Sequence, residues 1–259
     1  MRISSDAWRK YQQAHAKVRE AGQRELEEYF QTLPWDSDEE LALRMLKAKA
    51  IELVERYGPA DGALSAGMYD EIMASQSAGV PSARVAATSA PAEVSKDIED
   101  AIRRATSTES ARSLSSQVVG RHVKRCGIRT MRDNAARDHA MWAWVCIGDS
   151  CAFCRALGSN GWQQASRTVL RGSHADHIHA NCDCDFMVKK PGETLDIEGY
   201  DPDALLDEYA DASGGSSKDR INAMRRADYT PEYADERNAR RRELYALAHP
   251  QADDGAPSV

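Results

Sequence analysis

The stretch MWAWVCIGDSCAFC, residues 141–154, decides the fold class of this chain. Its first half is aromatic and β-branched, which favours a strand, and it follows a long region whose apolar residues recur at helical spacing. Its second half holds Cys151 and Cys154 in C-x-x-C spacing, which lets two thiolates bind one metal ion from a tight turn. We therefore expect an α+β protein, mainly α-helical, with a small β-sheet and a Cys/His knuckle.

The N-terminal part of the chain is predicted to be a helical hairpin. Apolar residues at spacings of three and four predict one helix over 5–33 and a second over about 37–57. The pair Gly58-Pro59 is expected to end the second helix, because glycine and proline commonly follow a helix. A shorter helix over about 60–75 is expected after it.

Composition suggests how the chain divides. Residues 76–93 are rich in Ser, Ala, Gly and Pro, which is typical of a linker. The expected organisation is an N-terminal helical region (1–75), this linker (76–93), a domain with the Cys/His site (94–190), an acidic then basic helical tail (191–249) and a disordered end (250–259).

The region after the predicted linker shows helical spacing again before the strand. Helices are expected over about 94–105 and from Thr108 to Gly127, and Thr130 is positioned to cap a further helix. The expected strands are 141–148 and 185–190. The tail is expected to form helices over 202–210, 218–227 and 231–248.

Bulk composition narrows the class of protein. The chain has 259 residues, of which 42% are hydrophobic and 29% charged, with a formal net charge of −7. These values are typical of a soluble globular protein. The sequence has neither an apolar run of about 18 residues, which a membrane span needs, nor the apolar core of a secretion signal. We therefore expect synthesis in a cytoplasm, where thiols stay reduced and clustered cysteines favour a metal over disulfides.

The candidate metal ligands lie in two short segments. HADHIHANCDC, residues 174–184, contains His179, Cys182 and Cys184, and it follows the pair Cys151 and Cys154. A structural zinc ion takes four such ligands, so these five residues are candidates for four positions. Two cysteines at C-x-C spacing on an extended segment point to opposite sides, so our preferred set omits Cys182. Packed cysteines without a metal are the alternative.

Charge is unevenly distributed along the chain. Residues 193–211 carry acids and no bases, whereas the segment before the cysteines is basic. The basic side chains are candidates for contact with DNA phosphates or with a protein partner: Arg112, Arg121, Lys124, Arg125, Arg129 and Arg132. Solvated helix faces are the alternative explanation.

Evidence for catalysis is sparse in the sequence. Asp176-His177-Ile178 matches the DHI core of HNH endonucleases, in which a histidine is the general base and a metal stabilises the phosphate charge. The asparagine and the downstream histidine of those enzymes are missing here. No G-x-S-x-G, Walker or H-E-x-x-H motif occurs. We expect no catalytic residues, and a metal-dependent nuclease is kept as an alternative.

The segment RDNAARDHAMWAWVCIGDSCAFCRALGSNGW, followed by HADHIHANCDCDFMV, resembles the MuF-like minor capsid proteins of tailed phages, also called head morphogenesis proteins, and is similar to the actinobacterial-phage type. The matching features are Asn134 to Arg137, the aromatic strand 142–147, the C-x-x-C pair, and the H-x-x-C-x-C that begins at His179. The resemblance covers roughly residues 110–190.

This resemblance implies a structural protein inside a phage head. The implied partners are the portal protein, the major capsid or scaffold protein, and DNA during head assembly or ejection. The implied location is the capsid interior of the virion, and the host cytoplasm during assembly. Related chains are sometimes associated with capsid maturation proteases, so a protease is a further alternative. The resemblance establishes no catalytic role.

Overall fold

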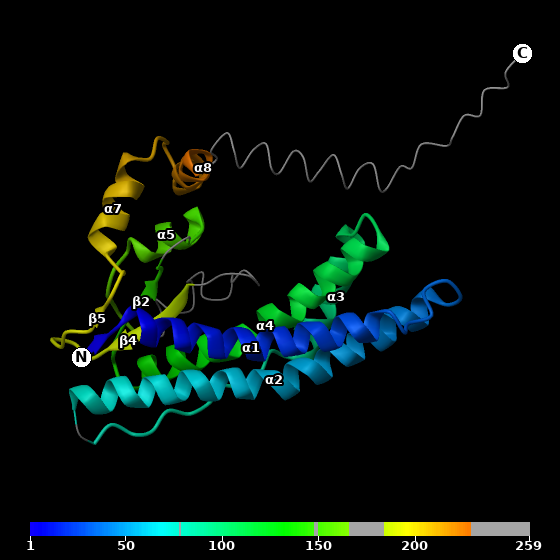
Figure 1. The fold of residues 1–259 in the computed structure, drawn as a ribbon, viewed down its shortest axis with the longest axis horizontal. Helices are drawn as coiled ribbons and strands as arrows, with labels where there is room; N and C mark the ends of the chain where they lie inside the picture. The colour runs from blue at the N-terminus through cyan, green and yellow to red at the C-terminus, as the bar shows by residue number, and fades with distance from the viewer. Residues whose placement is uncertain (78, 148–149, 166–183, 229–259) are drawn as a thin grey trace, which may run out of the picture.

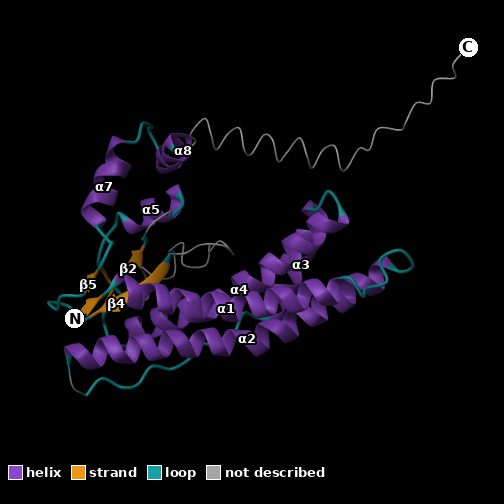
Figure 2. Ribbon diagram, viewed as in Figure 1, coloured by secondary structure: helices purple, strands orange, loops and turns teal. Residues whose placement is uncertain are grey.

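The computed structural model describes residues 1–259 except 78, 148–149, 166–183 and 229–259. Its frame consists of three long helices that lie side by side (Figures 1 and 2). These are α1 (Ser5–Phe30), α2 (Glu39–Gln76) and α4 (Thr108–Arg137). The shorter α3 (Pro91–Arg104) packs against both α2 and α4. The predicted N-terminal helical hairpin is present as α1 and α2, and the fold is mainly helical, as expected.

Two hydrophobic clusters hold this frame together. One lies among the helices and includes Leu26 of α1, Leu46 of α2, Ile98 of α3 and Val119 of α4, all fully buried. Burial of each such side chain contributes about 1.5–3 kcal/mol. The other cluster joins the start of α1 and the end of α2 to the small β-sheet. The helices before and after the predicted linker therefore share one core.

Two predicted helix ends are wrong. Helix α2 continues through Gly58 and Pro59, and α4 continues through Gly127. A Cβ at Gly58 would lie 2.8 Å from the Thr88 methyl, so this glycine allows another segment to approach the helix closely. Thr130 does not cap a new helix, because its hydroxyl donates to the carbonyl of Cys126 at 2.8 Å within α4.

The two predicted strands, together with a short third strand that was not predicted, form a small antiparallel sheet with the order β3–β2–β4. Strand β2 (Met141–Val145) lies between β3 (Gln163–Gln164) and β4 (Asp185–Lys189). Trp142 stacks on Phe186 with ring centroids 5.0 Å apart, and Trp144 meets the same ring edge-on at 5.9 Å. These aromatic contacts between neighbouring strands stabilise the residues MWAWV as a buried strand.

The segment after the sheet returns to the N-terminus. Strand β5 (Asp196–Ile197) pairs in parallel with β1 (Arg2–Ile3), and the backbone N–H of Ser5 donates to the Glu198 carboxylate at 2.9 Å. Helices α7 (Pro202–Asp211) and α8 (Ser217–Ala227) follow, as predicted. The predicted helix 231–248 and the predicted disordered end 250–259 lie outside the described residues.

Residues 81–90, within the predicted linker, form an extended segment that we call the strap. The strap has neither helix nor strand, but it is bonded to one side of α4. The Asn134 side chain accepts from the Arg84 N–H at 3.0 Å and donates to the Arg84 carbonyl at 2.8 Å. The Thr130 hydroxyl accepts from the Ala86 N–H at 3.0 Å. The division of the chain into domains at 76–93 stays a prediction.

Within the described part of the chain, no helix combines the length and the apolar character that crossing a membrane requires.

Candidate functional site: a thiol cluster beside a buried polar core

Three of the five predicted metal ligands lie together at the edge of the sheet. Cys151 is the N-cap residue of α5 (Ala152–Gly158), Cys154 lies in the first turn of that helix, and Cys184 directly precedes β4. The Cys154 sulfur lies 3.4 Å from the Cys151 sulfur and 3.2 Å from the Cys184 sulfur. Cys154 and Cys184 are buried, whereas Cys151 is exposed. The other two predicted ligands, His179 and Cys182, lie outside the described residues.

The backbone at these cysteines is held from three directions. The Cys146 thiol, just after β2, donates to the Cys154 carbonyl at 2.9 Å. The Lys124 ammonium of α4 donates to the Cys184 carbonyl at 2.8 Å. Arg155 binds the Ser150 carbonyl at 2.6 Å and also pairs with carboxylates of Glu208 and Asp228. The sulfurs are therefore positioned by the sheet, by α4 and by the C-terminal helices together.

The donor chemistry fits zinc. Thiolates that share one tetrahedral zinc lie about 3.8 Å apart, given Zn–S bonds of about 2.3 Å. The two sulfur–sulfur distances here, 3.4 and 3.2 Å, are slightly shorter than that separation. Among the residues that the structure describes, no three His, Cys, Asp or Glu side chains already converge in the geometry of a metal site. A zinc ion would therefore need a small rearrangement of these sulfurs, and a fourth ligand.

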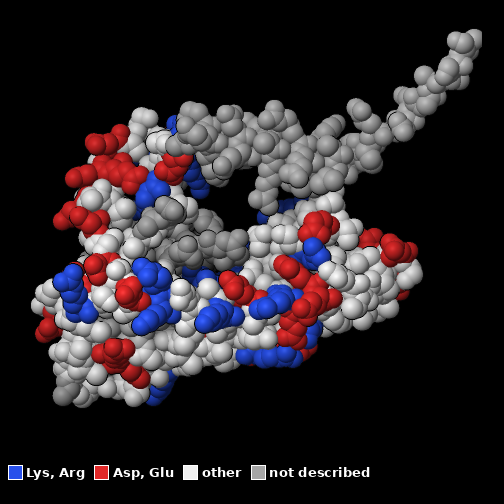
Figure 3. All heavy atoms as spheres, in the orientation of Figure 1, with Lys and Arg blue, Asp and Glu red and all other residues white. Residues whose placement is uncertain are grey.

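The six basic residues predicted to contact DNA or a protein partner do not form one exposed surface. Lys124 and Arg125 are only 2% and 5% exposed. Five of the six, all but Lys124, pair with acids on α3 or on α4 itself: Arg125 and Arg129 with Glu93, Arg121 with Asp97, Arg112 with Glu109, and Arg132 with Asp133. On the face shown in Figure 3, basic and acidic side chains alternate over the bundle, whereas acids gather over α7. Arg121, Arg125 and Arg129 thus link α4 to α3, whereas Arg112 and Arg132 pair within α4.

Sequence reasoning missed a Ser–His–Asp arrangement beneath the strap. The Ser89 hydroxyl lies 2.7 Å from His122 Nδ1, and Asp97 Oδ2 lies 3.0 Å from His122 Nε2. In serine hydrolases a histidine that is bonded to an aspartate activates the serine hydroxyl. Here Ser89 is only 4% exposed and His122 is fully buried, so a substrate cannot reach the hydroxyl in this structure. Burial and the nearby Arg125 lower the pKa of His122 to about 4, so the imidazole is neutral at pH 7. The arrangement ties the strap to α3 and α4.

A second buried pair lies where α1, α2 and α4 meet. His15 Nδ1 lies 2.7 Å from Asp61 Oδ1, and both side chains are almost fully buried. The pKa of the neighbouring Tyr11 is raised well above its ordinary value by burial and by the charge of Asp185. The signal that would have found both polar clusters is the presence of isolated histidines on otherwise apolar helix faces.

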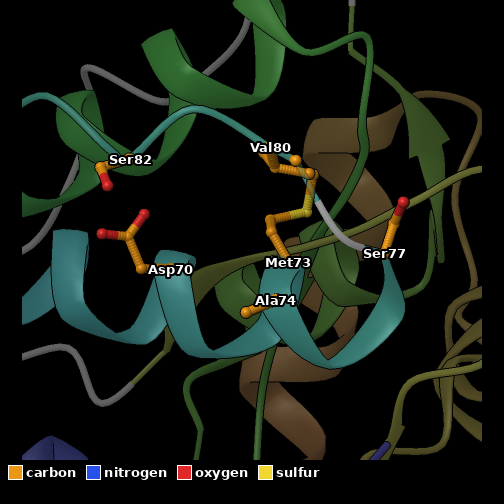
Figure 4. A pocket seen from close by; sticks show the side chains of 7 residues that line it. Asp70, Met73, Ala74, Ser77, Val80 and Ser82 are labelled. Atoms are coloured by element: carbon orange, nitrogen blue, oxygen red, sulfur yellow. The ribbon is translucent and has the colours of Figure 1, made fainter.

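A small pocket lies where the chain leaves α2 and turns toward the strap (Figure 4). Asp70, Met73 and Val80 are among the residues that line it. The Asp70 carboxylate accepts the Ala83 N–H at 2.7 Å, so this charge supports the strap. The pocket lining holds none of the predicted ligands.

Comparison with known proteins identifies the family. A family model described as "VG15 protein" matches residues 2–212, which include the helical frame, the sheet and the thiol cluster. Neither the curated proteins nor the solved structures contain a match to this chain. This match does not by itself confirm the MuF-like resemblance seen in the sequence. Because the match covers most of the chain, this protein belongs to the VG15 protein family, a phage-associated family of viral gene products.

Proposed function

We propose that this protein is a structural component of a tailed-phage head, a minor capsid protein that associates with the portal and the capsid interior. The observation that carries the proposal is the family match over residues 2–212, which makes the chain a phage-associated protein. The MuF-like pattern supports the narrower role. The expected partners are the portal protein and the major capsid or scaffold protein, with DNA as a further contact.

The distribution of polar groups supports a structural role. The buried histidines, His15 and His122, bind carboxylates that belong to neighbouring helices. Ser89, whose hydroxyl contacts His122, is buried and cannot be reached by a substrate. These groups are used to fix the helices and the strap, which suits a protein that must keep its shape inside a crowded assembly.

A structural zinc ion is part of the proposal. Cys151, Cys154 and Cys184 would supply three ligands, and His179 or Cys182 the fourth. The zinc would connect α5 to the start of β4, two elements that are separated by a long stretch of sequence. Its role would be to stabilise this part of the fold rather than to activate water.

The experiment that tests the function is quantitative mass spectrometry of purified virions. The expected result is a few copies per particle, close to the copy number of the portal protein. Absence from the virion, together with abundance in the lysate, would overturn the structural role. A protein present at hundreds of copies would also contradict it, because that number belongs to a major shell component.

The nuclease alternative has a separate test. Purified protein is incubated with supercoiled plasmid and Mg²⁺, Mn²⁺ or Zn²⁺, with His177→Ala as the matched control. We expect intact plasmid with both proteins. Nicking by the wild type that disappears in the variant would establish the nuclease and displace the structural proposal.

A further inference from the structure

We propose that Cys151, Cys154 and Cys184 form a disulfide relay, in which a bond closes between the first two cysteines and then passes to the buried pair. The Cys154 sulfur contacts both other sulfurs, at 3.4 Å from Cys151 and 3.2 Å from Cys184. A disulfide bond is about 2.05 Å long, so either bond requires the sulfurs to move by little more than 1 Å. Because the Cys154 sulfur can form only one disulfide, the bond to Cys151 and the bond to Cys184 exclude each other.

Access decides where oxidation begins. Cys151 is exposed at the start of α5, whereas Cys154 and Cys184 are 2% and 4% exposed. A dissolved oxidant therefore meets the Cys151 sulfur first. Attack by a thiolate depends on access as well as on its charge state, so the buried pair is oxidised through Cys151.

The reaction balances with a small-molecule disulfide as the oxidant. The Cys151 thiolate attacks one sulfur of that disulfide, forms a mixed disulfide and releases one small thiolate. The Cys154 thiol then gives its proton to the small thiolate that has just been released, attacks the Cys151 sulfur and releases the second small thiolate. The protein gains one disulfide, and the oxidant is reduced to two thiols.

The second step is an internal exchange. The Cys184 thiolate attacks the Cys154 sulfur, and Cys151 leaves as a thiolate that takes up a proton. The Lys124 ammonium fixes the Cys184 carbonyl, and the Cys146 thiol fixes the Cys154 carbonyl. Because both backbones are held, the buried pair keeps its sulfurs in contact. The product is a bond between α5 and the start of β4 that solvent cannot reach.

The relay and the zinc proposal concern alternative states of the same sulfurs, because a zinc ligand must be a reduced thiolate. Neither the relay nor its test depends on the role in the phage head. Saturating zinc should protect the three cysteines from oxidation, whereas metal-free protein should be oxidised. Oxidation that zinc leaves unchanged would speak against metal binding and leave the relay intact.

The test uses the whole 259-residue chain with Cys182→Ser, treated with a chelator and exposed to oxidised glutathione. Samples are alkylated at timed intervals and digested with trypsin. Peptide 138–155 holds Cys146, Cys151 and Cys154, and peptide 172–189 then holds Cys184 alone. We expect a bond within the first peptide to appear early. A link between the two peptides should follow, with Cys151 becoming open to alkylation again.

Variants give the test its controls. Cys151→Ser should slow oxidation of the buried pair at least tenfold, and Cys154→Ser should leave a lasting glutathione adduct at Cys151. The buried Cys126, whose pKa is raised to about 11 by burial, should stay reduced throughout. Circular dichroism verifies that each variant is folded. The relay is overturned if Cys151→Ser oxidises at the wild-type rate, or if the bond never leaves the first peptide.

Discussion

At the scale of single residues, Gly127 shows how closely α2 and α4 pack. A Cβ at this position would overlap Asp61 Oδ2 and lie 2.7 Å from the Ser65 hydroxyl. Asp61 is almost fully buried and bonded to His15, so it has no room to withdraw. We expect Gly127→Ala to lower the free energy of unfolding by about 1–3 kcal/mol, the usual cost of overpacking. Urea denaturation measures this change.

Gly67 provides the matched control. It also lies within a helix, α2, but a Cβ there would meet nothing within 4 Å. Gly67→Ala should be neutral or raise the free energy of unfolding by up to about 1 kcal/mol, because alanine is the better helix former. Equal effects of the two substitutions would show that helix propensity, and not the contact with Asp61, decides the outcome at Gly127.

His122 makes stability depend on pH. Its pKa is lowered from 6.5 to about 4 by burial and by Arg125, so the unfolded chain binds this proton at a higher pH than the folded chain does. The stabilisation is complete above pH 6.5 and is lost as the pH falls toward 4. This one group should remove up to about 3 kcal/mol over that interval.

The measurement is the free energy of unfolding at pH 7 and pH 4.5 for the wild type and His122→Gln. Glu25 and Asp138 also have a lowered pKa and lose stabilisation at low pH, but they do so in both proteins. The variant should therefore show the smaller pH dependence. A pH dependence that is the same in both proteins would mean that His122 is protonated without cost in the folded state.

At the scale of elements, the strap is held by a row of α4 side chains spaced four residues apart. His122, Cys126, Thr130 and Asn134 all bond to it, through Ser89, Ala86 or Arg84. We expect the native protein to resist trypsin after Arg84 although this residue is exposed. Asn134→Ala removes two of the bonds, at about 0.5–1.5 kcal/mol each, and should speed cleavage there about tenfold.

Asp133→Ala is the control for this prediction, because that side chain is exposed and pairs with its neighbour Arg132 within α4. It should leave the cleavage rate unchanged. Rapid cleavage after Arg84 in the wild type would instead support the predicted linker and a division of the chain at 76–93. The proteolysis experiment therefore also decides the domain organisation.

At the scale of the whole molecule, the sequence was informative where pattern alone determines structure. The aromatic run MWAWV predicted β2, and apolar periodicity predicted the hairpin and the helices after the sheet. The sequence-based prediction was wrong at Gly58 and Gly127. A glycine that ends a helix and a glycine that lets a neighbouring segment pack closely cannot be distinguished until the position of that segment is known. The burial of Lys124 could not be predicted from the sequence either, because it depends on the Cys184 carbonyl, which accepts from the ammonium at 2.8 Å.

The candidate site was predictable only in part. The spacing of the cysteines placed Cys151, Cys154 and Cys184 together, and the structure brings their sulfurs into contact. Contact of the basic residues of α4 with DNA or a partner stays a prediction, but the structure adds acids that pair with several of them, on α3 or within α4. Charge along a sequence does not reveal such pairing across helices.

The two hydrophobic clusters lead to a prediction about metal removal. Cys154 and Cys184 belong to the apolar cluster that includes Trp144 and Phe186, whereas Leu26 and Leu46 belong to the other. Zinc at 100 times its dissociation constant would stabilise the state that binds it by about 2.7 kcal/mol. Amide hydrogen exchange in β2 and β4 should therefore become about 100-fold faster when a chelator removes the metal, while exchange near Leu26 and Leu46 stays the same.

Cys184→Ser should reproduce the effect of the chelator and make further chelation ineffective. If chelation instead speeds exchange equally around both clusters, the chain opens as a single unit and the metal stabilises the whole fold. If it changes exchange nowhere, although metal analysis shows zinc leaving the protein, the metal has no structural role. The expected local response follows from the packing, because β2 and β4 can separate from α5 while the helices around Leu26 and Leu46 keep their own buried contacts.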